Sequence, residues 1–155
     1  MVEIKVKVQI DAPIEKVWDV ISQVNDDPKF WTLTKSVKNI SKYGNEIERM
    51  VIVGKVDKCQ QKVTLLPKEA IHVVWTKGVI TGTKEIVLTS LGNRTLLEVQ
   101  ISYTISGLAN FFPGRVAEEL QIEAEVAVDL IKEKVEGKPY LPMIERKLWA
   151  DLIRG

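Results

Sequence analysis

Cysteine and histidine are nearly absent from this chain, which has one of each, Cys59 and His72. A single cysteine has no partner for a disulfide within the chain, so nothing indicates an oxidising compartment. A zinc site needs several cysteine or histidine ligands, and a nucleophilic triad would have to use His72. We interpret Cys59 as a small core residue and His72 as a surface residue. The sequence predicts no metal, no cofactor and no catalytic set.

The chain has no excess of either charge, because 22 lysines and arginines balance 21 aspartates and glutamates, for a net charge of +1. Such a balance recruits neither nucleic acid nor an anionic membrane, and no glycine-rich phosphate motif occurs. No run approaches the ~20 apolar residues of a membrane span, and the N-terminus lacks a signal peptide's apolar block. We expect a cytoplasmic protein without a nucleic-acid partner or membrane span. The nearest basic patch, typical of the solvated face of an edge region, is Lys29, Lys35, Lys38 and Lys42.

The first 31 residues contain the most informative pattern. Apolar and polar residues alternate over residues 2–10, which is the period of a half-buried strand. Residues 11–13 then end the strand, with Pro13 suited to the first turn of a helix. Apolar residues follow at helical spacing to residue 24, and Asn25-Asp26-Asp27-Pro28 breaks the helix before Phe30 and Trp31. We interpret Asp26-Asp27 as a helix stop rather than a metal site.

The remainder is predicted to be a run of strands followed by one long helix. Short turn signals separate strands at residues 34–42, 46–53, 57–66, 69–76, 79–91 and 95–105, which indicates an antiparallel meander. A helical stripe covers residues 115–136 and ends at Gly137. About 22 residues give a helix of ~33 Å, long enough to cross the sheet. Two small residues at its centre, Ala124 and Ala127, leave room beneath it.

This element order describes an α+β helix-grip fold, with a seven-stranded antiparallel sheet wrapped around a long C-terminal helix and two short helices after the first strand. The opening Ile10-Asp11-Ala12-Pro13-Ile14-Glu15-Lys16-Val17-Trp18, with Asp27-Pro28 and Trp31 after it, resembles the START-like (SRPBCC) superfamily. Within that group it most resembles the polyketide cyclase/coenzyme Q-binding branch, of the carbon monoxide dehydrogenase G-subunit type. The resemblance covers residues 1–136 and implies a hydrophobic ligand held between sheet and helix.

Residues 137–155 lie outside the resemblance and are predicted to form an extension with a short packed helix. Its apolar residues include Leu148 and Trp149. Ile122 and Val126, which lie off the main stripe of the long helix, are plausible contacts for it. A homodimer or a protein partner would explain the same pattern.

Polar residues predicted to point inward are the exceptions on an otherwise apolar face. Arg49, Gln61, Lys84 and Tyr103 share faces with apolar strand residues, although a bulge would turn Arg49 or Lys84 outward. Glu123 borders the helix stripe and could pair with Arg49 or Lys84. Singly, each is explained by a hydrogen bond or ion pair at the sheet rim. Together, a few convergent polar groups in an apolar hollow are what a ligand pocket requires.

The predicted site is a hollow of ~300 Å³ or more. Two aromatic pairs, Phe30-Trp31 and Phe111-Phe112, are predicted to form its mouth and act as a hydrophobic gate. The expected ligand-binding residues are Phe30, Trp31, Arg49, Gln61, Trp75, Lys84, Tyr103, Phe111, Phe112, Leu120, Ala124 and Ala127. A non-catalytic carrier or sensor of a quinone, lipid or polyketide-like molecule ranks first, because no catalytic set is found. A cyclase or dehydratase using the polar residues ranks second. An accessory factor for assembly of a larger enzyme, implied by the G-subunit resemblance, ranks third.

Overall fold

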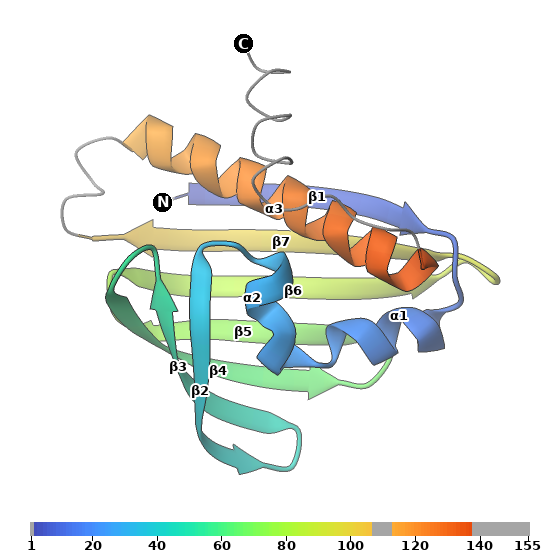
Figure 1. Ribbon diagram of the computed structural model, residues 1–155, viewed down its shortest axis with the longest axis horizontal. Helices are drawn as coiled ribbons and strands as arrows, with labels where there is room; N and C mark the ends of the chain where they lie inside the picture. Colours follow the sequence, from blue (N-terminus) through green and yellow to red (C-terminus); the bar gives the residue numbers. More distant parts are fainter. Residues whose placement is uncertain (1, 107–112, 138–155) are drawn as a thin grey trace.

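The computed structural model describes residues 2–106 and 113–137. Their seven strands form one antiparallel sheet in the order β1-β7-β6-β5-β4-β3-β2 (Figure 1). The strands are β1 (Val2–Ile10), β2 (Thr34–Tyr43), β3 (Glu46–Val53), β4 (Asp57–Leu66), β5 (Ala70–Lys77), β6 (Ile80–Ser90) and β7 (Thr95–Ile105). Strands β2 to β7 are a meander, and β1 pairs with β7. This confirms the predicted sheet, with strand bounds that agree to within a residue.

All helices described lie on one face of the sheet (Figure 1). They are α1 (Ile14–Ile21), the 3₁₀ turn η1 (Val24–Asp26), α2 (Asp27–Phe30) and α3 (Pro113–Glu136). The first helix begins one residue later than expected, so that Pro13 occupies its N-cap position. Within the two described ranges, no helix combines the length and the apolar character needed to cross a membrane.

The core lies between the sheet and the helices, as the residue alternation predicted. On β7 the inward side chains are buried while Glu98 and Gln100 are exposed. Cys59 is a buried core residue, and the partly exposed His72 lies 3.6 Å from Glu85 across the outer face. The buried stripe of α3 is Leu120, Ala124, Ala127, Val128, Leu130, Ile131 and Val135.

Strand β2 is one edge of the sheet and is almost entirely exposed. Its pairing with β3 shifts register twice, between Thr34 and Ser36 and again between Asn39 and Ser41. Three of the predicted surface lysines, Lys35, Lys38 and Lys42, lie on it and are exposed. These three form the solvated face of an edge strand, whereas the fourth lysine of the predicted patch, Lys29, is exposed on α2.

Candidate functional site

A row of polar and aromatic side chains crosses the inner face of the sheet from β3 to β7. The strand register places Arg49 opposite Gln61, and Gln61 opposite Trp75. Trp75 lies opposite Gly82, which in turn lies opposite Tyr103. All four side chains are buried. Four of the predicted site residues thus form one continuous row, which we call the inner polar row.

Arg49 holds the short helices against the sheet. Its side chain is only 1% exposed, and its Nε donates to Gln61 Oε1 at 2.8 Å. Its Nη1 donates to the Val24 carbonyl at 2.9 Å, and its Nη2 donates to Asp27 Oδ2 at 2.5 Å. Arg49 therefore faces inward, and its partners are Gln61, η1 and α2. The role of Asp27 was missed, because two acids before a proline also fit a simple helix stop.

Trp75 and Tyr103 meet edge to face over Gly82, with ring centroids 5.4 Å apart and an interplanar angle of 71°. A Cβ on Gly82 would overlap the Ser102 carbonyl oxygen, so only glycine fits here against the backbone of β7. Burial raises the pKa of the Tyr103 hydroxyl and the nearby charge of Glu123 adds to this, while the indole N–H of Trp75 opposes it. Tyr103 is therefore a neutral hydroxyl in the core.

Lys84 lies beside this row, with its side chain on the inner face. It pairs with Val73 on β5 and Ile101 on β7 without a bulge, and is 5% exposed. Its Nζ lies 3.7 Å from the centroid of the Trp31 ring, which follows α2. Burial lowers the pKa of Lys84, although the carboxylates of Asp27 and Glu123 oppose the shift. Lys84 therefore faces inward, and Trp31, one of the predicted gate residues, covers its ammonium group.

Glu123 connects α3 to the start of β2. Its Oε2 accepts a hydrogen bond from the Leu33 backbone N–H at 2.5 Å. Burial raises the pKa of Glu123, while the Leu33 N–H and the charge of Lys84 oppose the rise. The predicted ion pair of Glu123 with Arg49 or Lys84 is wrong for the described residues, because neither forms a salt bridge with it there. Its partner is a backbone amide, which side-chain patterns do not reveal.

Exchanging Glu123 for glutamine is expected to stabilise the protein more at neutral pH than in mild acid. Glutamine keeps an oxygen that can accept the Leu33 N–H. The pKa of Glu123 in the folded protein lies above its ordinary value of 4.5. Glu123 therefore makes its full contribution to the free energy of unfolding at pH values below that ordinary pKa. This contribution is lost as the pH rises through the folded-state pKa. Urea unfolding of both proteins from about pH 4 to 7 measures the difference.

The exposed Glu125 on the same helix provides the control, since Glu125→Gln removes a carboxylate that faces solvent. Its effect on the unfolding midpoint is expected to change little across this pH range. A stabilisation by Glu123→Gln that is equally flat would contradict the raised pKa of Glu123 in the folded protein.

The other predicted site residues are divided between the interior and the helix surface. Leu120, Ala124 and Ala127 lie on the buried stripe of α3, whereas Phe30 is half-buried at the end of α2. Phe111 and Phe112 lie outside the described residues. Ala124 and Ala127 have 0% exposure, so their methyl groups are packed against other atoms. No open hollow therefore lies against these two residues in the part of the chain that the structure describes, and a ligand there must loosen this packing.

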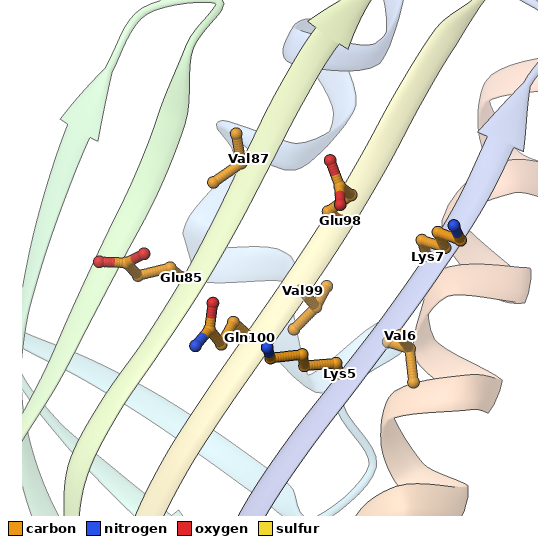
Figure 2. Close-up of a pocket in the computed structure, with 8 residues that line it drawn as sticks. All are labelled: Lys5, Val6, Lys7, Glu85, Val87, Glu98, Val99 and Gln100. Carbon is orange, nitrogen blue, oxygen red and sulfur yellow. The ribbon is translucent and has the colours of Figure 1, made fainter.

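Three depressions in the described surface lie away from the inner polar row. One of about 420 Å³ lies on the outer face of β6, β7 and β1, among Lys5, Val6, Lys7, Glu85, Val87, Glu98, Val99 and Gln100 (Figure 2). Acids and bases mix there, as on an ordinary solvated face. A second, of about 240 Å³, includes Phe30 and lies between the short helices and α3. The third, of about 470 Å³, lies between β1 and the first half of α3.

Solved structures of similar fold come from several bacteria. A Thermus thermophilus protein has a TM-score of 0.75 and 14% identity, covering 87% of this chain and 97% of that one. The Zhui aromatase/cyclase of Streptomyces has a TM-score of 0.72 and 14% identity, with coverages of 86% and 93%. A START superfamily protein from Mycobacterium smegmatis has a TM-score of 0.69 and 18% identity, with coverages of 88% and 99%. At such identities the likeness concerns the fold.

The comparison with curated proteins gave no match. A family model described as polyketide cyclase/dehydrase and lipid transport matches residues 1–136. The chain therefore belongs to the polyketide cyclase/dehydrase and lipid transport family.

Proposed function

We propose that this protein carries or senses a small apolar molecule, bound between the sheet and α3 with its polar end at the inner polar row. The observation that carries this proposal is the burial of that row and of Lys84 in an otherwise apolar interior, with the partly buried Glu123 beside them. A protein core needs no such groups, because apolar residues of similar volume are often neutral or stabilising in place of buried ionic groups. Few polar groups converging within an apolar space are typical of ligand sites.

The segment from η1 to the start of β2 is the proposed entrance. It carries Trp31 over Lys84 and is held by two interactions from opposite sides. Arg49 holds it from the sheet, and Glu123 holds it from α3. Because the interior is packed in this structure, a ligand must displace Trp31 to reach Lys84. The predicted gate residues Phe30 and Trp31 lie at this entrance.

Native mass spectrometry of protein purified from its own host tests the proposal, together with thermal shifts on adding a quinone, a fatty acid and an aromatic polyketide. We expect a bound small molecule or a rise in melting temperature with at least one class. Ala124→Leu is expected to reduce that rise, because its larger side chain occupies the volume beneath α3 that a ligand would have to open. The matched control is Ala117→Leu. Ala117 lies on the same helix but lines the third surface depression, between β1 and α3. No bound molecule and no shift would contradict the proposal.

A cyclase or dehydratase is the second candidate function. Its specific support is the neutral Tyr103 hydroxyl near Glu123, a carboxyl group whose pKa burial raises in the direction that suits a general acid. Tyr103→Phe removes one hydroxyl and little volume. If the protein is an enzyme of this kind, that variant is expected to lose turnover of a polyketide-like substrate while still binding it. Unchanged turnover in Tyr103→Phe and in an Arg49 variant would remove this candidate.

A role in assembling a larger enzyme, as the likeness to the G-subunit type of carbon monoxide dehydrogenase implies, is the third candidate. It depends on residues 137–155, which we propose as an extension to a ligand-binding domain of residues 1–136. The family match also ends at residue 136. Deleting residues 138–155 separates the cases. Loss of monomer stability makes the extension part of the core and weakens the partner interpretation.

A further inference from the structure

We propose that the bound molecule carries a carboxylate, and that Lys84 and Trp75 hold its two oxygens. This inference rests on the proposed function and narrows its ligand to an apolar carboxylic acid. The two side chains come from neighbouring strands, β6 and β5, and both are buried on the inner face. Trp75 lies opposite Gly82, two residues before Lys84 on the same face.

The ammonium group of Lys84 lacks an anionic partner within the described ranges. Each of the two carboxylates that influence it makes its closest interaction elsewhere. Asp27 accepts from Arg49 at 2.5 Å, and Glu123 accepts from the Leu33 N–H at 2.5 Å. The contact that remains to Lys84 is the face of the Trp31 ring. A buried ammonium is costly unless it is paired and hydrogen-bonded, which leaves this position suited to an incoming anion.

Trp75 presents a second unused donor. Its indole Nε1 is buried and forms no hydrogen bond with the residues that the structure describes. The Tyr103 hydroxyl is near enough for the indole N–H to oppose the rise in its pKa, but the two groups do not reach hydrogen-bond geometry. An indole N–H and a lysine ammonium can only donate. Two buried donors on one face therefore require an acceptor, and the charge of Lys84 favours an anionic one.

Arg49, the other buried cation of this face, does not compete for that anion. Its guanidinium already donates to Gln61, to the Val24 carbonyl and to Asp27. The carboxylate of Asp27 neutralises its charge at the same time. An incoming anion is therefore drawn to Lys84 rather than to Arg49.

The experiment compares acids with their methyl esters, using decanoate and methyl decanoate for an aliphatic tail and 2-naphthoate and its ester for an aromatic one. Affinities are measured by isothermal titration at neutral pH. We expect the intact protein to bind the preferred acid about tenfold or more tightly than its ester. Lys84→Met is expected to remove that preference while leaving ester affinity unchanged. The control Lys62→Met, on an exposed lysine paired with Glu46, is expected to keep it.

Trp75→Phe provides a second variant that keeps an aromatic ring. It is expected to weaken the acid and the ester alike, because both offer an acceptor to the indole N–H. Equal affinity for acid and ester in the intact protein overturns the inference and leaves the proposed function standing. A preference for the acid over the ester that persists in Lys84→Met also overturns the inference and leaves the proposed function standing. If neither acid nor ester binds at any concentration tested, the inference falls. The proposed function falls with it only if native mass spectrometry and the thermal shifts with the other ligand classes are also negative.

Discussion

Replacing Arg49 by alanine is expected to lower the free energy of unfolding by about 3–5 kcal/mol. The guanidinium is 1% exposed and donates to three partners, so its loss leaves unmet acceptors on Gln61, Val24 and Asp27. It also leaves the Asp27 carboxylate, whose side chain is 15% exposed, without its cation. Urea unfolding followed by tryptophan fluorescence measures the effect.

A second substitution isolates the charge in this effect. Adding Asp27→Asn to Arg49→Ala removes the uncompensated carboxylate and is expected to recover part of the lost stability. The exposed pair of Lys62 and Glu46, 3.4 Å apart, is the control, because Lys62→Ala is expected to cost less than about 1 kcal/mol. If Arg49→Ala lowers the free energy of unfolding no more than Lys62→Ala does, the hydrogen bonds of Arg49 do not hold η1 and α2 against the sheet.

Placing alanine at Gly82 is expected to destabilise the protein by about 3 kcal/mol or more. Two causes act together. The backbone φ is +129°, a conformation that residues with a Cβ rarely adopt, and the new Cβ would overlap the Ser102 carbonyl oxygen. The strands must therefore separate where Trp75 and Tyr103 meet. Thermal unfolding measures the loss.

Gly44 separates backbone strain from steric clash. Its φ is +59°, but a Cβ there would meet nothing within 4 Å. Gly44→Ala is therefore expected to cost only the strain of a left-handed residue, about 1–2 kcal/mol. Comparable losses at the two glycines would mean that the close approach at Gly82 relaxes easily.

Sequence periodicity predicted which side chains face inward, but it could not predict what they touch. Alternation placed Arg49 and Lys84 on the inner face only on condition that their strands are regular, and the pairing of both residues meets that condition. The partners of these residues depend on chain geometry outside the strands. Asp27 reaches Arg49 only because η1 and α2 fold back over β3, and Glu123 finds a backbone amide 90 residues away.

The alignment of the four side chains in the inner polar row could not be predicted from the sequence either. Alternation fixes the face of each strand but leaves its register against the next strand open. The register decides that Arg49, Gln61, Trp75 and Tyr103 lie in line rather than scattered over the sheet. Gly82 lies between the strands of the two rings in an unbroken ladder, and Trp75 and Tyr103 meet across it.

The irregular edge strand β2 has a consequence for self-association. An unpaired strand edge presents free backbone donors and acceptors, on which another chain can add a strand and start an aggregate. Here two register shifts disturb the edge, and Lys35, Lys38 and Lys42 place positive charge along it. A second copy approaching edge to edge would bring like charges together over a mismatched ladder. We therefore expect the open edge at β2 to be a poor template for strand addition.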